Sequence, residues 1–264
     1  MLENNQRIIE AYSKAEKQFS VAVDRVVAGE KFDAGVPRIS SSLSNRIVSL
    51  DGLDLESFDS KIKIFEGDRL DWTLADLIES DYRPGHIVDV VAARVFVFNK
   101  LNEQYSGDLE KVKSDKFFRK YCNSVFDTGS VLTYNKRDGF YLDVSDNNPL
   151  WDVGKLRNNE EKAIRVDGVS GERVEVHGLL FVDDVVDDSL FWRVAIPDRS
   201  LRQSYASLVS KFSGKGGIMR VILPANNKSD TYARPVWISS IYCNSNAGSY
   251  ISMKASSRLF GERK

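Results

Sequence analysis

Apolar residues recur at helical spacing in two segments of the chain. At residues 4–28 the intervals between apolar positions are three and four, which predicts an amphipathic helix; its stripe is Ile8, Tyr12, Ala15, Phe19, Ala22 and Val26. This stripe either packs on the chain's own domain or forms a seam between two copies of the chain. Residues 87–105 are apolar on nearly every face. Their length favours a buried helix over a strand.

Shorter patterns predict the remaining elements. Two apolar runs, at residues 131–134 and 140–144, flank the turn signal Asp138-Gly139 and predict a hairpin. Further helices are predicted at residues 73–80, 108–123 and 204–212. Further strands are predicted at residues 163–166, 173–182, 190–196, 218–223 and 236–242. The pattern therefore predicts an α+β protein.

A polar stretch at residues 150–161 separates two segments that differ in their predicted secondary structure. We predict a mainly helical N-terminal domain with a hairpin at residues 1–155. A small β-rich domain is predicted to follow at residues 160–264.

The charges of the chain are unevenly placed. The 264 residues carry 37 Lys and Arg against 38 Asp and Glu, a net charge of −1. From Ser189 to Lys264, however, twelve basic residues face three acidic ones, so this segment has a net charge of +9 and residues 1–188 have −10. Such asymmetry indicates a polyanion partner, or an acidic segment held against a basic one. The basic end of the chain, residues 256–264, is either a partner-binding tail or a disordered terminus.

Cysteine content and hydropathy indicate the compartment. Cys122 and Cys243 are too few for a disulfide framework, and the start of the chain lacks the layout of a signal peptide. No apolar run approaches 18 residues, so no membrane span is expected. The sequence predicts a cytoplasmic protein without a membrane partner.

Motifs for catalysis and metal binding are largely missing. The two histidines, His86 and His177, and the two cysteines lack the spacing of zinc ligands, and no Gly-x-Ser-x-Gly motif occurs. One acidic cluster is either a solvated loop or a Mg²⁺ site for phosphodiester cleavage, and it consists of Asp183, Asp184, Asp187 and Asp188. We expect no catalytic residue, no metal and no cofactor, with a metal-dependent nuclease as the minor alternative.

The C-terminal segment resembles the OB-fold single-stranded-DNA-binding proteins in its order of elements. The resemblance rests on five stretches, at residues 174–182, 191–195, 205–212, 218–222 and 237–242. It implies a five-stranded barrel whose aromatic rings stack on bases and whose cations contact phosphates. The candidate site residues are Trp192, Arg193, Lys211, Lys215, Arg220, Arg234 and Trp237.

Two functions follow from these observations. The first is a nucleic-acid-binding protein, with single-stranded DNA as the expected partner. The alternative is a structural or interaction subunit of a multiprotein or viral assembly, in which the basic segment meets an acidic protein surface. A protein partner at the acidic N-terminal domain or at the basic tail, and a homo-oligomer through the stripe at residues 4–28, are further expectations.

Overall fold

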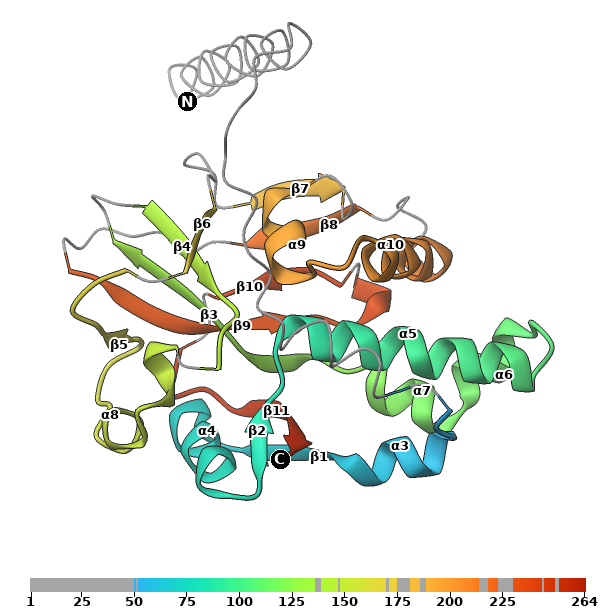
Figure 1. Ribbon diagram of the computed structural model, residues 1–264, viewed down its shortest axis with the longest axis horizontal. Coiled ribbons are helices and arrows are strands. Elements are labelled where there is room, and N and C mark those ends of the chain that lie inside the picture. Colours follow the sequence, from blue (N-terminus) through green and yellow to red (C-terminus); the bar gives the residue numbers. More distant parts are fainter. Residues whose placement is uncertain are drawn as a thin grey trace, which may run out of the picture. The chain divides into compact units, whose positions relative to one another are not determined.

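A mixed β-sheet with helices on both faces organises the computed structural model of the protein (Figure 1). The structure describes residues 50–264, except for residues 51, 136–138, 147, 170, 175–180, 186–188, 214–217, 223–229, 244 and 250–251. Ser41–Lys264 form one compact unit. The helix predicted at residues 4–28 lies outside the described residues, so its role in a homo-oligomer stays a prediction.

Eleven strands of the described residues share the sheet. They are β1 (Ile62–Gly67), β2 (Tyr82–Pro84), β3 (Phe126–Asn135), β4 (Gly139–Asp143), β5 (Ile164–Arg165), β6 (Glu172–Val174), β7 (Phe181–Val185), β8 (Ile218–Ile222), β9 (Tyr232–Ile238), β10 (Ala247–Gly248) and β11 (Ser257–Arg263). The main order is β1-β11-β3-β9-β10-β8-β7, with β2 beside β11, β5 beside β9, and β4 and β6 extending from β3. β11 runs parallel to β3, and β10 runs parallel to β8.

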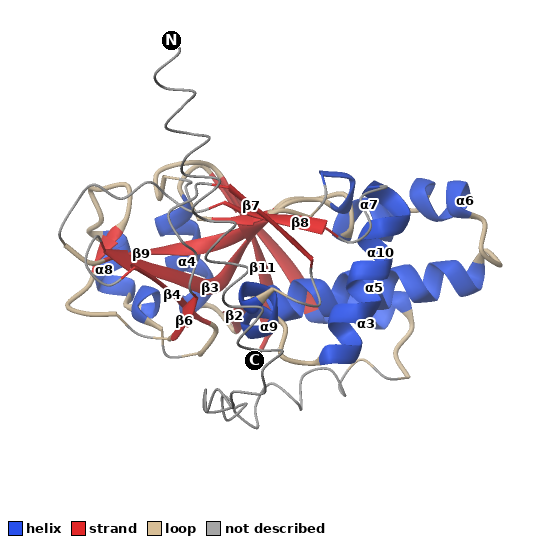
Figure 2. Cartoon of the chain, turned by 90° about the horizontal axis from the view of Figure 1, so that it is seen from above, coloured by secondary structure: helices blue, strands red, loops and turns tan. Residues whose placement is uncertain are grey.

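Alternate residues of the central strands face two different helical layers. The helices are α3 (Leu55–Lys61), α4 (Leu70–Glu79), α5 (Ile87–Gln104), α6 (Leu109–Ser114), α7 (Lys116–Tyr121), α8 (Val153–Arg157), α9 (Leu190–Ala195) and α10 (Arg199–Ser213). Val131 of β3 packs in a cluster with α4 and α8, whereas Leu132 packs in a larger cluster with α5, α7, α9 and α10. Figure 2 shows α5, α7 and α10 grouped together, away from α4 and α8. Because both faces are covered, β3 is buried at all ten positions.

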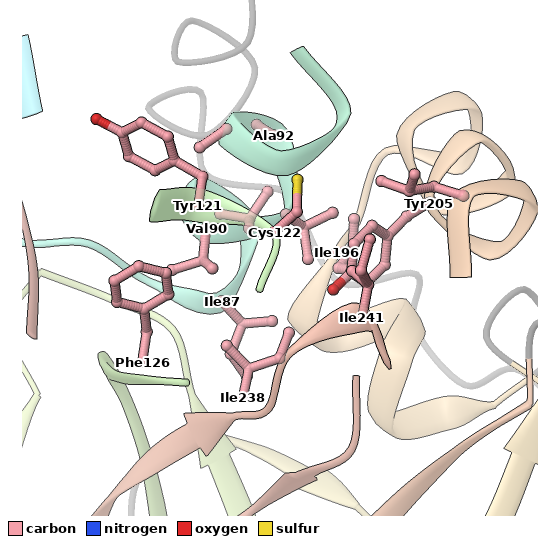
Figure 3. Close-up of a cluster of buried hydrophobic side chains, with 14 of the residues drawn as sticks. Ile87, Val90, Ala92, Tyr121, Cys122, Phe126, Ile196, Tyr205, Ile238 and Ile241 are labelled. Carbon is pink, nitrogen blue, oxygen red and sulfur yellow. The ribbon is translucent and has the colours of Figure 1, made fainter. Parts of the chain in front are cut away.

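Helix α5 confirms the helix predicted at residues 87–105. His86 caps its start, and the Asp89 carboxylate accepts a hydrogen bond from the His86 backbone at 2.7 Å. Ile87 and Val90 of this helix lie in the same apolar cluster as Phe126 and Ile238 from the sheet (Figure 3). The helix is apolar on most sides because the sheet, α7 and α10 all pack against it.

The hairpin and one further helix are also confirmed, but two other elements differ. β3 and β4 form the predicted hairpin, and α10 contains the predicted helix at residues 204–212. The segment predicted as one helix at residues 108–123 is two helices, since Asp115 caps α7 through a bond from Phe117 N at 2.8 Å. The strand predicted at residues 190–196 is instead the helix α9, which Ser189 caps.

The basic end of the chain is a strand of the sheet. Residues 257–263 form β11, which pairs with β1, β2 and β3 and buries Leu259 and Phe260. The prediction of a basic tail is therefore wrong. Neighbouring strands, which a local sequence pattern cannot show, provide the burial.

The α+β class is confirmed, but the two predicted domains are not separate, because strands from both belong to one sheet. The predicted boundary at residues 155–160 covers the end of α8 and the residues that follow it, inside the compact unit. Strands β1 to β4 share one sheet with β5 to β11. The C-terminal part is therefore not a separate barrel, because its strands share a sheet with those of the N-terminal part.

Charges from the acidic and the basic segments meet within this sheet. Arg258 of β11 lies 3.4 Å from Glu66 of β1, and Arg83 of β2 forms an ion pair with Glu262 of β11. The Arg258–Glu66 contact sets a cation of the basic segment against an anion of the acidic segment, so the asymmetry along the sequence is partly cancelled in space. None of the helices in the described ranges has the length and apolar character needed to cross a membrane.

Candidate functional site

A groove of about 350 Å³ lies between α5 and α10. The two helices run side by side on one face of the sheet (Figures 1 and 2). The floor of the groove is apolar and consists of Val95, Phe98 and Leu208. Its rim is polar and consists of Asn99, Gln203, Ser204, Ser207 and Lys211. Because five of the eight lining residues are polar, a ligand in this groove would be held mainly by hydrogen bonds and charge.

The spacing of residues on the two helices produces this groove. On α10, Ser204, Leu208 and Lys211 recur at intervals of four and three, so they share one face of the helix. Ser204 and Ser207 are both exposed, and their short side chains leave space between the helices. Val95 and Phe98 form the matching face of α5.

A buried arginine fixes the two walls relative to each other. The guanidinium of Arg94 on α5 donates to the Tyr205 hydroxyl of α10 at 2.7 Å and to the Ser245 hydroxyl at 3.1 Å. It also donates to the backbone oxygens of Tyr121 at 3.1 Å and Ser124 at 2.7 Å. Arg94 has no exposed surface, and no carboxylate of the described residues pairs with it. Its charge is compensated by oxygen atoms of three segments, which therefore hold α5 and α10 in place.

Among the described residues that line the groove, Lys211 is the only charged one. Its ammonium lies 5.0 Å from the centroid of the Phe98 ring, a distance typical of a cation–π contact. Within the described ranges no carboxylate lies at ion-pair distance from Lys211. The groove therefore combines one available cation with neutral hydroxyl and amide groups.

The other predicted site residues lie elsewhere. Trp192 is fully buried on α9, and Trp237 is 6% exposed on β9, so neither ring has a face open to a base. Arg193 is exposed on α9 and Arg220 is exposed on β8. Arg234 of β9 lies 5.7 Å from the Tyr134 ring centroid and donates to the Ser249 oxygen at 3.3 Å. Lys215 lies outside the described residues.

A second polar cluster joins β3, the start of α5 and the segment after β4. His86 Nε2 lies 3.1 Å from an Asp146 carboxylate oxygen, and His86 Nδ1 lies 3.4 Å from Ser130 Oγ. These are the residue types of a catalytic triad. However, Ser130 and His86 have no exposed surface, and Ser130 Oγ also accepts a hydrogen bond from Ile87 N at 3.1 Å. The cluster therefore connects elements of the fold, and no substrate can reach its serine.

The acidic cluster considered for magnesium is only partly described. Asp183 and Asp184 lie on β7, opposite Arg220 and Met219 of β8, while residues 187 and 188 fall outside the described ranges. Where the chain is described, no group of three or more His, Cys, Asp or Glu side chains is arranged to hold a metal ion.

Comparisons with known proteins identify the fold. No protein-family model matches the sequence, and no curated protein matches it. Among solved structures, one chain has a TM-score of 0.50 and 14% sequence identity, and the match covers 76% of this chain and 97% of that chain. That structure was described as showing how the C-type lectin fold accommodates massive sequence variation in Nanoarchaeota. This protein is similar in fold to a C-type lectin.

The C-type-lectin-like fold overturns two predictions. The resemblance to OB-fold single-stranded-DNA-binding proteins is wrong, because residues 191–195 are helical and β9 pairs with β3 inside a larger sheet. The predicted nucleic-acid-binding function, which rested on that resemblance and on the positive charge of residues 189–264, is wrong as well. Burial of Trp192 and Trp237 also removes the stacking surface that this function required.

Lys211 is the one predicted site residue among the described residues that line the groove. The sequence indicates it only as one of several cations in the basic segment. The residues that face Lys211 come from α5, more than a hundred positions earlier in the chain. The serine spacing on α10 was a usable signal, but only the packing of α5 reveals what the serines line.

Proposed function

We propose that this protein is a non-catalytic recognition protein that binds a small polar ligand in the groove between α5 and α10. The observation that carries the proposal is the lining of the groove. Its neutral hydrogen-bonding rim and its lysine offer donors and acceptors to a polar ligand. By contrast, the buried histidine cluster offers no accessible nucleophile.

Two further observations support a binding role. The Arg94–Tyr205 hydrogen bond fixes the two walls, and a site that is preformed loses less entropy when a ligand binds. The structural neighbour from Nanoarchaeota shows that a C-type lectin fold can accommodate massive sequence variation. A fold that tolerates such variation is a suitable scaffold for a recognition surface.

Filling the groove tests this function. The full chain is titrated with a panel of small polar compounds, namely saccharides, polyols and hydroxy acids, while amide resonances are followed by NMR. We expect at least one compound to shift the resonances of Asn99 and Ser207. Ser207→Leu adds apolar volume at an exposed position of the groove, so we expect it to weaken binding by about tenfold or more through loss of space.

Ser200→Leu is the matched control. Ser200 is an exposed serine on the same helix that does not line the groove, so this variant should bind with unchanged affinity. Binding that is insensitive to Ser207→Leu would show that the ligand site lies elsewhere. A panel without any binder would remove the proposed function.

A further inference from the structure

We infer that the outer edge of strand β1 binds an extended, acidic segment of a partner protein, which adds to the sheet as a further strand. No residue of β1 lines the groove between α5 and α10, so this surface is separate from the proposed ligand site. β1 is the last strand of the main sheet order, and within the described residues no strand pairs with its outer edge. Figure 1 shows β1 at one side of the sheet, with α4 and α3 at its two ends.

The hydrogen bonds of β11 determine which backbone groups of β1 point outward. The backbone oxygen of Phe260 accepts a hydrogen bond from Gly85 N at 2.7 Å, on the side of β11 that faces β2. Because backbone groups alternate sides along an antiparallel strand, the odd-numbered residues of β11 bond to β1. Their partners in the register are Lys63, Phe65 and Gly67. The N–H and C=O groups of Ile64 and Glu66 therefore point away from the sheet, where an added strand can bond to them.

The two faces of β1 differ in their chemistry. Ile62 and Ile64 lie on one face, where they are half-buried and pack against the larger apolar cluster, as Leu53 and Leu55 do. Lys63 lies on the opposite face and is exposed. A strand that alternates apolar and charged residues therefore matches both faces when it pairs with β1.

The available charges at this edge are positive. Lys61 and Lys63 are exposed, and no carboxylate of the described residues lies at ion-pair distance from either of them. By contrast, both carboxylates of residues 59–67 already have a basic neighbour, at 2.6 Å for Asp59 and at 3.4 Å for Glu66. An acidic partner therefore meets available cations and does not have to break an internal ion pair.

Two aromatic rings hold the Lys63 ammonium near the edge. It lies 4.7 Å from the centroid of the Phe65 ring and 5.6 Å from that of the Tyr82 ring. A cation–π contact at an exposed site is weak, and the lysine stem is flexible, so the ammonium can turn to a carboxylate on an added strand. The rings therefore place the cation without neutralising its charge.

A second copy of this chain fits the edge poorly. In a two-fold antiparallel pair the axis is perpendicular to the sheet, so odd-numbered residues of one β1 lie opposite odd-numbered residues of the other. Lys63 would then meet only lysine, phenylalanine or glycine of the other copy, because Glu66 lies on the other face. Lysines on edge strands oppose such self-pairing, whereas an acidic strand of another protein meets no repulsion from Lys63.

Alternating peptides test the inference on the full chain. The probe is a capped peptide of about eight alternating glutamate and valine residues, slightly longer than the six residues of β1, and the comparison peptide alternates lysine and valine. Backbone amide resonances are followed by NMR at low salt. We expect the glutamate peptide to bind about fivefold or more tightly than the lysine peptide, because its carboxylates meet Lys61 and Lys63. Added salt should weaken this preference.

Amide hydrogen exchange shows whether the peptide adds as a strand. In the free protein the amides of Ile64 and Glu66 should exchange fast, whereas those of Lys63 and Phe65, which bond to β11, should be protected. The glutamate peptide should protect Ile64 and Glu66 as well. The same peptide with all its backbone nitrogens methylated keeps its charges but cannot donate to β1, so it should bind about tenfold or more weakly.

Substitutions of Lys63 test the charge. Lys63→Gln should reduce the preference for the glutamate peptide, and Lys63→Glu should abolish it. Lys100→Gln is the matched control, because Lys100 also lies over a phenylalanine ring, 5.7 Å from the Phe96 centroid, but belongs to α5. This variant should keep the preference.

Several results overturn the inference. Equal affinity for the two charged peptides does so, and so does binding that leaves the Ile64 and Glu66 amides unprotected. Protection of these amides without peptide would show that the edge is already occupied, and light scattering would then distinguish a dimer of this chain from an internal contact. Absence of binding by either peptide removes the inference and leaves the proposed function of the groove standing.

Discussion

Replacement of Asp127 by Asn should change the dependence of stability on pH. Asp127 is 5% exposed in β3, where the register with β9 shifts between Asp127 and Val131. Its carboxylate accepts a hydrogen bond from the backbone N–H of Arg258 at 3.2 Å. Burial raises the pKa of Asp127 to about 6 from its ordinary value of 3.8, against the smaller opposing effect of that hydrogen bond.

This shift fixes both the sign and the size of the effect. The folded protein binds the proton of Asp127 more tightly than the unfolded chain does. The resulting stabilisation is therefore fully present below about pH 4 and is lost as the pH rises through about 6. A difference of about two pKa units corresponds to about 3 kcal/mol of unfolding free energy.

Urea unfolding of the wild type and of Asp127→Asn between about pH 4 and pH 8 measures this contribution. Asparagine does not titrate, so the stability of the variant relative to the wild type should rise by up to about 3 kcal/mol across this range. Both proteins contain the same other titrating groups, so the contributions of those groups cancel in the difference between the two unfolding free energies. A constant free-energy cost of the new amide shifts this difference equally at every pH and leaves its slope against pH unchanged. A difference that stays constant between pH 4 and pH 8 would refute the reasoning.

Asp54→Asn provides a control of opposite sign. The Asp54 carboxylate caps α3 and accepts a hydrogen bond from Ser57 N at 2.7 Å, which lowers the pKa of Asp54. Its stabilising contribution is therefore present at neutral pH and is lost as the pH falls through its lowered pKa. Stability of this variant relative to the wild type should increase as the solution becomes acidic.

Three further predictions follow from the core. Arg94→Met leaves two buried backbone oxygens without their donor and should lower the unfolding free energy in urea by about 2–5 kcal/mol; a loss below about 1 kcal/mol would contradict the assigned role. A thiol reagent should label the exposed Cys243 in the folded protein. It should label Cys122 only after urea unfolds the chain, because Cys122 is buried and burial raises the pKa of its thiol to about 12. Mass spectrometry identifies the labelled residue. Removal of residues 257–264 deletes β11, which lies between β1 and β3. The truncated chain should therefore lose cooperative unfolding, which circular dichroism monitors. Cooperative unfolding of the truncated chain would show that these residues are a dispensable tail.

Several elements could be predicted because their signals are local. The continuous apolar pattern of α5, the Asp138-Gly139 turn signal of the hairpin and the apolar face of α10 each lie within a few residues of one another. Residues 191–195 show the limit of this approach. A short apolar run suits a helix or a strand equally, and here the Ser189 cap and the packing of Trp192 produce a helix.

The candidate site could be predicted only in part. Lys211 was recognisable as an available cation, but the groove requires α5 and α10 to lie side by side. The burial of Trp192 and Trp237 could not be predicted for a related reason. Sequence shows that a residue is aromatic, whereas only packing shows whether its ring is covered, as the rings of Trp192 and Trp237 are.

The sequence by itself determined the α+β class, the position of the central helix and the uneven distribution of charge. The tertiary structure alone decided that β11 lies between β1 and β3, and that Arg258 and Glu66 are neighbours across the two segments. It also decided that the fold is similar to a C-type lectin. The physical reason is that periodicity and turn residues act over a few positions, whereas strand pairing and burial depend on residues that are distant in the chain.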